Sequence, residues 1–179
     1  EKLYTEAYEI LHKNRSIVDT DLKAFQSLNE LLFFGAHLAE RDISVGKFID
    51  ANSNDCHPLV AKIIKASRKY TAADAFRAIY KIAETRQKTQ IFWSQNDVLV
   101  VPTVGALLTK EVCEIDPLGP NFQNGSYTNF ANLLGLSGLA VPFGKSPANV
   151  PWGLTLYTKP DRFSAAFQLA KDIGKFVKR

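Results

Sequence analysis

The hydrophobic positions of this chain fall into two patterns, short continuous runs and longer stretches with helical spacing. Two short runs, Val98–Val101 and Leu139–Val141, are each followed by a proline, Pro102 and Pro142. Runs of this length, rich in valine and leucine and bounded by turn residues, are typical of strands buried on both faces. A third segment, Gly153–Thr158, alternates between apolar and polar residues and predicts another strand.

Helical spacing dominates the first part of the chain. Apolar residues recur at helical intervals in residues 1–13, 22–39 and 36–49, and residues 59–68 form a basic amphipathic stretch. Between the first two of these helices, residues 16–21 are a candidate for a short strand. The chain is therefore predicted to be mainly helical before its first long strand.

One long helix is predicted to begin at Thr71. Thr71 and Asp74 have the spacing of a capping box, in which each side chain bonds the backbone of the other residue. No glycine or proline follows until well past Gln95, so a helix of about 25 residues would extend roughly 37 Å. Its apolar face is expected to consist of Phe76, Ile79, Tyr80, Ala83 and Ile91.

The order of these elements predicts an α/β fold with a mixed β-sheet flanked by helices. The compact apolar segment Thr128–Leu136 is predicted to form a short helix between two strands, and residues 105–125 are expected to be mainly loop. We interpret the chain as one domain without internal boundaries. It has a helical region at about 1–95, a strand and loop core at about 96–158, and a terminal helix at about 163–178.

Composition narrows the possible functions. Hydrophobic residues make up 46% and charged residues 22% of 179 residues, which is ordinary for a globular domain with its own core. The net charge of +4 comes from dispersed basic residues, which argues against a nucleic-acid partner. No apolar run approaches the roughly 20 residues that span a membrane. The two cysteines are isolated, which favours a reducing compartment, and we expect a cytoplasmic protein.

The sequence predicts neither a metal site nor a cofactor site. The three histidines share no metal-ligand spacing, and no cofactor-binding motif is present. The sequence contains no methionine, which we interpret as chance or as a sign of an internal fragment.

Five segments of the sequence resemble a known family of enzymes. They are GAHLAER (35–41), HPLVAKII (57–64), YTAADAFRAIYKIAETR (70–86), DVLVVPT (97–103) and YTNFANLLGLSGLAVPFG (127–144). Together they resemble the amidase-signature hydrolases and, among these, the amidase domain of the allophanate hydrolases. The resemblance extends over nearly the whole chain but corresponds only to the later part of such a domain.

This resemblance implies an activity that the chain alone cannot perform. The family uses a serine nucleophile, a second serine and a lysine base, and the serines lie in a Gly/Ser-rich motif that precedes these segments. The only Gly-Ser pair here, Gly125-Ser126, is followed by Tyr127 and belongs to a later segment. A serine needs a base and oxyanion donors to react. The resemblance therefore implies that the complete protein hydrolyses allophanate to ammonia and carbon dioxide in urea degradation, whereas this chain contains no catalytic residues.

The predicted substrate-binding residues are Tyr70 and Arg77. Arg77 lies about 9 Å further along the helix axis than Tyr70, and long helical side chains lean toward the N-terminus, so it can reach back. An arginine beside a helix N-terminus suits a small carboxylate. By resemblance, these two residues contact the substrate. The alternative is that Arg77 lies on a polar face with Lys81 and Glu84, and that Tyr70 only packs.

Three further residues are expected to shape the pocket. Thr128 and Asn132 match polar positions of the family, where hydrogen bonds to backbone loops are expected, and Gly144 is expected to allow tight backbone geometry. The expected partners are a small carboxylate or amide substrate such as allophanate and the missing N-terminal part of the amidase domain. Amphipathic helices and the family likeness also make a homodimer plausible.

Two other functions stay open at this stage. One is a non-catalytic binding or interaction module derived from an amidase, and the other is a different amidase-signature hydrolase. A natural short protein should present a polar face in place of an open sheet edge. A segment of a larger enzyme should instead show an unpaired strand beside exposed apolar surface.

Overall fold

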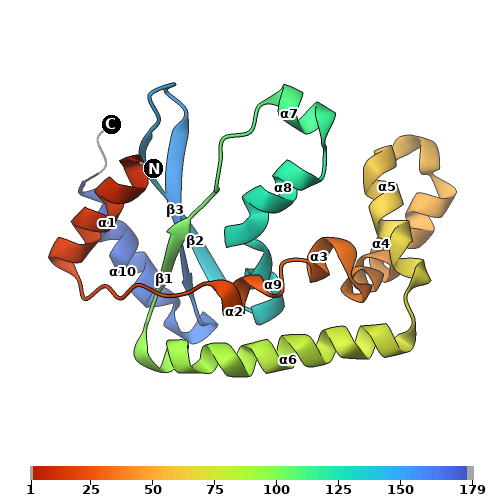
Figure 1. The fold of residues 1–179 in the computed structure, drawn as a ribbon, viewed down its shortest axis with the longest axis horizontal. Coiled ribbons are helices and arrows are strands. Elements are labelled where there is room, and N and C mark those ends of the chain that lie inside the picture. The colour runs from red at the N-terminus through yellow and green to blue at the C-terminus, as the bar shows by residue number, and fades with distance from the viewer. Residues whose placement is uncertain (1, 177–179) are drawn as a thin grey trace.

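The computed structural model describes residues 2–176 and shows an α/β arrangement, with a small sheet at one end and a long helix beneath the molecule (Figure 1). In chain order the elements are α1 (Lys2–Asn14), α2 (Lys23–Gln26), α3 (Leu31–Phe34), α4 (Ala39–Ala51), α5 (Pro58–Lys65), α6 (Ala72–Gln95), β1 (Leu99–Pro102), α7 (Lys110–Ile115), α8 (Gly119–Asn124), α9 (Asn129–Leu134), β2 (Ser137–Lys145), β3 (Pro151–Thr158) and α10 (Phe163–Gly174). Short 3-10 turns connect several of the helices, among them η1 (Ala36–Leu38) and η3 (Ala66–Lys69).

The sheet has the strand order β1-β3-β2, and both neighbouring pairs are antiparallel. Val101 of β1 lies opposite Thr155 of β3, and Val141 of β2 lies opposite Leu154. The predicted α/β class is confirmed, although the strands described here pair only in the antiparallel sense. Because β1 and β2 both run opposite to β3, their carboxyl ends lie at the same end of the sheet.

One face of the sheet packs against the two terminal helices. Alternate residues of β2 and β3, including Val141, Phe143, Leu154 and Leu156, are buried against α1 and α10. The opposite side of β2 is exposed at Gly138, Ala140 and Pro142. The prediction that both apolar runs are buried on both faces is therefore wrong for β2, because none of the described helices covers that side of it.

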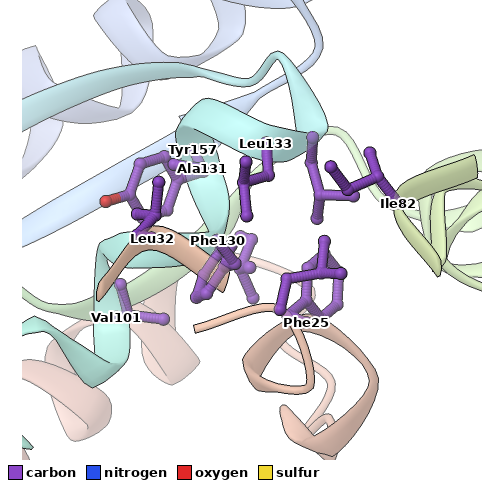
Figure 2. Close-up of a cluster of buried hydrophobic side chains, with 11 residues drawn as sticks. Phe25, Leu32, Ile82, Val101, Phe130, Ala131, Leu133 and Tyr157 are labelled. Carbon is purple, nitrogen blue, oxygen red and sulfur yellow. The ribbon is translucent and has the colours of Figure 1, made fainter. Parts of the chain in front are cut away.

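The other face of β1 and β3 supports the main core, which we call the Phe130 cluster. Phe130 is completely buried, and its ring centroid lies 5.4 Å from that of Phe25 and 5.6 Å from that of Tyr157. Figure 2 shows these side chains converging from different elements of the chain. The other buried members are Leu28, Leu32, Ile82, Leu99, Val101, Ala131, Leu133 and Leu134.

The predicted capping box at the start of α6 is confirmed. The Thr71 side chain accepts a hydrogen bond from the Asp74 amide at 3.2 Å, and the Asp74 carboxylate accepts from the Thr71 amide at 2.9 Å. The predicted burial of the helix is wrong, because Phe76 and Tyr80 are exposed and the buried positions are Ala78, Ile82, Thr85 and Thr89. Apart from Ile82, the buried positions carry small side chains or threonines, whereas the predicted apolar residues Phe76 and Tyr80 point away from the core.

Three other local expectations differ from the structure. Residues 22–39 form two short helices and a 3-10 turn rather than one helix. Residues 27–30 form a turn between α2 and α3, and Gly35 is extended between α3 and η1. Residues 16–21 contain no strand. Residues 105–125 contain α7 and α8, and α7 is capped by the Thr109 hydroxyl, which accepts from the Val112 amide at 3.4 Å.

Candidate functional site

The N-terminus of α6 carries both predicted substrate-binding residues. Arg77 is exposed over 74% of its side chain and donates from Nη1 to Oδ1 of Asp74 at 2.8 Å. The bonds from Thr71, followed by Arg77, hold the pKa of the Asp74 carboxyl below its ordinary value. A carboxylate therefore already lies beside this helix end and orients the guanidinium.

Tyr70 is fixed by a different partner. Its hydroxyl donates to the backbone carbonyl of Phe34, and the Lys69 ammonium lies 5.2 Å from the centre of its ring. The structure thus places Tyr70 and Arg77 at the same end of α6 but bonds them to separate groups. Tyr70 is half-buried, whereas Arg77 faces solvent.

The segment around α9 contains the predicted pocket residues Thr128 and Asn132. The Thr128 hydroxyl donates to the Gly125 carbonyl at 3.3 Å, which ties the segment to its own backbone. Asn132 is exposed, and its carbonyl accepts from the amide of Gly135, which ends α9 in the left-handed conformation at φ 67°. Left-handed backbone favours glycine, which has no Cβ to clash.

Two buried asparagines in this region were not predicted as site residues. Asn29 is 5% exposed and donates through Nδ2 to the Ser126 carbonyl at 2.9 Å, while its Oδ1 has no partner among the described residues. Asn129 is 9% exposed, and its Nδ2 also lacks a partner within residues 2–176. A Cβ at Gly125 would lie 2.6 Å from that nitrogen, so a larger residue there would force the Asn129 amide to move. Sequence spacing alone could not reveal Asn29, which lies about a hundred residues from Ser126.

The ends of β1 and β2 come together through β3. The Thr103 amide donates to the Gly153 carbonyl at 3.0 Å, and Pro142 lies opposite Gly153 on the other side. The Thr155 hydroxyl donates to the Thr103 hydroxyl at 3.0 Å. Gly144 follows an irregularity in the strand register, and a Cβ there would lie 3.0 Å from Cδ2 of Leu3. Gly144 therefore serves close packing between β2 and α1.

A large hollow lies elsewhere, along β1. It has a volume of about 880 Å³ and is lined by α1, the loop after it, β1, residues 104–107 and part of the β2–β3 hairpin. None of the five predicted site residues lines it. Tyr127, the residue before the predicted Thr128, does line it. The predicted binding residues and this hollow are therefore separate features.

Two expectations about ligands and membranes can be compared with the described residues. Within residues 2–176, no group of three or more His, Cys, Asp or Glu side chains could hold a metal ion. In the same range, no helix is both long and apolar enough to cross a bilayer. Cys56 and Cys113 are both free and partly buried.

Comparison with known proteins identifies first a class of protein. No family model matches the chain. A crystal structure of an amidase matches 99% of this chain with a TM-score of 0.79, and the chain covers 42% of that protein. The sequence identity is 19%, so this match shows the fold alone. The fold is that of the amidase-signature proteins.

Closer relatives then narrow the assignment. Urea amidolyase from Lachancea kluyveri is 35% identical over 193 aligned residues, which include 99% of this chain and 10% of that protein. A structure of Kluyveromyces lactis allophanate hydrolase is 35% identical and has a TM-score of 0.92, covering 98% of this chain and 29% of that one. The chain therefore matches a segment of allophanate hydrolase and of urea amidolyase, and it spans only a small part of the relatives' length.

Proposed function

We propose that this chain forms the substrate-pocket side of an allophanate-hydrolysing amidase domain in a longer protein. The observation that carries the proposal is its match to allophanate hydrolase, with 35% identity and a TM-score of 0.92 over 98% of the chain. In the complete protein, a serine supplied by another segment attacks the amide, and water then releases the acyl group. The chain by itself is inactive, because it lacks the serine pair and the lysine.

In this proposal Arg77 binds the carboxylate of allophanate. Its guanidinium uses Nη1 for Asp74. The donors on Nη2 and Nε stay available to a second carboxylate, since an arginine has five N–H groups in a fixed fork. The oxygen of Tyr70, whose hydrogen points to Phe34, can accept a bond from an amide N–H group of the substrate. Thr128, Asn132 and Gly144 support the neighbouring backbone.

Replacing Arg77→Ala in the complete protein tests this role. We expect kcat/KM for allophanate, measured by ammonia release, to fall about a hundredfold or more, because a site built to bond a charged group loses its partner. Lys81→Ala is the matched control, since it removes the same charge one turn further along α6. Equal kinetics for the two variants would contradict the assignment of Arg77.

A second substrate separates allophanate recognition from general amidase activity. A simple amide without a carboxylate does not need Arg77, so Arg77→Ala should leave its hydrolysis nearly unchanged. If the variant lost both activities equally, Arg77 would be needed for the fold or the chemistry rather than for the carboxylate. If the wild-type protein preferred the simple amide, another amidase activity would replace the proposed one.

The same proposal includes a cytoplasmic homodimer. The apolar stripe of α6 formed by Phe76, Ile79, Tyr80 and Ile91 is exposed, and a second copy is a suitable cover for it. The free cysteines agree with a reducing compartment. Light scattering on the complete protein should give twice the mass of one polypeptide, and a single-polypeptide mass would remove the dimer from the proposal.

A further inference from the structure

Asp74 uses its two carboxylate oxygens for different partners. Oδ2 accepts from the Thr71 amide at 2.9 Å and from the Thr71 hydroxyl at 2.7 Å. Oδ1 accepts from Nη1 of Arg77 at 2.8 Å. Because the capping bonds fix the carboxylate through Oδ2, Oδ1 stays beside the guanidinium when a ligand arrives.

This fixed carboxylate differs from an ordinary ion pair further along the same helix. Lys88 contacts Glu84 at 2.7 Å, but Glu84 is 61% exposed and has no second bonding partner within residues 2–176. Exposed pairs of that kind hold their geometry weakly. The Asp74 side chain is 36% exposed, and the bonds from Thr71, followed by that from Arg77, keep the pKa of its carboxyl below the ordinary value. Asp74 is therefore a fixed negative charge at neutral pH.

The charges around the start of α6 are suited to one carboxylate. Residues 69–77 contain two cations, Lys69 and Arg77, and one anion, Asp74. The Lys69 ammonium contacts the Tyr70 ring and pairs with no carboxylate of residues 2–176. One positive charge is therefore left over. The neighbouring ion pairs of the arm are already balanced, because two carboxylates face two cations there: Asp42, Asp50, Lys65 and Arg68.

We propose that Asp74 restricts this site to substrates with a single carboxylate. The proposal rests on the proposed function, in which Arg77 binds the carboxylate of allophanate. Allophanate carries that carboxylate at one end and an amide at the other, and both ends lie within about 8 Å, the screening length at physiological salt. The charge of Asp74 repels a second carboxylate at the amide end. An amide N–H group there is instead attracted, because Oδ1 keeps one lone pair free.

Two small acids of the size of allophanate test this role. Malonamate carries the same carboxylate and amide, joined by CH₂ instead of N–H, and malonate has a second carboxylate in place of the amide. Titration calorimetry on the complete protein at neutral pH gives the Kd of each acid. We expect the wild type to bind malonamate at least about tenfold more tightly than malonate, and Asp74→Asn to reduce this ratio about tenfold, because the variant removes one nearby unit charge.

Two further variants separate the charge of Asp74 from its capping role. Asp74→Glu keeps both the charge and the capping box, so the ratio should stay as in the wild type. Thr71→Ala removes the capping hydroxyl but leaves Asp74 and Arg77 in place. It should lower the unfolding temperature by a few degrees and keep the wild-type ratio. Asp74→Asn itself retains an oxygen for the Thr71 amide, so the helix start is preserved.

Three results would overturn the proposal. An unchanged ratio in Asp74→Asn would show that its charge selects nothing, while the carboxylate site itself would stand. An equal fall of the ratio in Thr71→Ala would assign the effect to the helix cap. If neither acid bound to the wild type, the carboxylate site would be absent, and the proposed function would fall as well. Because binding is measured without turnover, a protein that prefers malonamate through Asp74 but releases no ammonia from allophanate would contradict the proposed reaction alone.

Discussion

The Phe130 cluster and the arm formed by α4, α5 and η3 are held together by different forces. The cluster joins α2, α6, α9 and the sheet through buried rings, with Phe130 at its centre. In Figure 1 the arm lies over the beginning of α6, and Arg68 joins η3 to α4 by donating to Asp42 at 2.9 Å and to Asp50 at 2.8 Å. The cluster consists of buried rings and aliphatic side chains, whereas the arm combines a few buried aliphatic residues with ion pairs at its surface.

The arm also exposes apolar side chains that the cluster would bury. Ile43 is 85% exposed and Phe48 is 59% exposed, whereas Ile49 and Ile64 are the buried aliphatic residues of α4 and α5. Exposed ion pairs contribute little to stability and are screened by salt. The arm should therefore unfold locally more easily than the cluster, and its local stability should respond to pH before that of the cluster does.

The largest expected effect comes from emptying the cluster. Phe130→Ala should lower the free energy of unfolding by about 3–5 kcal/mol, because it removes a buried ring and leaves a cavity. Urea unfolding followed by tryptophan fluorescence is a suitable measurement, since Trp93 packs against the cluster. Phe76→Ala is the control at a position that is 56% exposed and should change the value by less than about 0.5 kcal/mol. Similar losses for both would contradict the described packing.

A smaller, local loss of stability is expected in the arm as the pH is lowered. Hydrogen bonds from Arg68 and then Lys65 lower the pKa of the Asp50 carboxyl to about 2. A depressed folded-state pKa stabilises the fold above the unfolded value of 3.8, and this contribution is lost as the pH falls from about 4 toward 2. Exchange of α4 and α5 amides should therefore accelerate in that window while the cluster stays protected.

The comparison variant for this acid effect is Asp50→Asn. It should open the arm at neutral pH and flatten the change between pH 4 and 2. Asp161→Asn removes a carboxylate that forms no ion pair within residues 2–176 and should leave the profile as it is in the wild type. If Asp50→Asn kept the full acid response, other carboxylates would be responsible for it.

The sequence predicted those elements whose determinants are local. The capping box of Thr71 and Asp74 located the start of α6, and the apolar run ending at Pro102 located β1. The face of α6 was predicted wrongly because hydrophobicity alone favours Phe76 and Tyr80, whereas contact with the rest of the fold selects smaller side chains such as Ala78. Which face is covered depends on partners that no local pattern specifies.

The candidate site was less predictable than the fold. The roles of Tyr70 and Arg77 stay predictions, because hydrogen bonds to Phe34 and Asp74 are equally compatible with a structural role. The pairing of Asn29 with Ser126 arises only when distant segments meet, so spacing could not reveal it. Residues that work through tertiary contacts need the fold before they can be named.

The smallest expected effect tests whether charge really organises the arm. Gly46 is buried within α4, and alanine at such a position ordinarily stabilises a helix by about 0.5–1 kcal/mol. Here a Cβ would lie 2.8 Å from Cγ of Asp42 and 3.1 Å from Nη2 of Arg68, so the methyl group would displace the ion pair. Gly46→Ala should consequently give no gain in the free energy of unfolding. The expected gain should return in an Asp42→Asn background, where the ion pair is already weakened, and the double-mutant cycle measures the difference. A full gain from Gly46→Ala alone would show that the pair between Arg68 and Asp42 does not hold the arm.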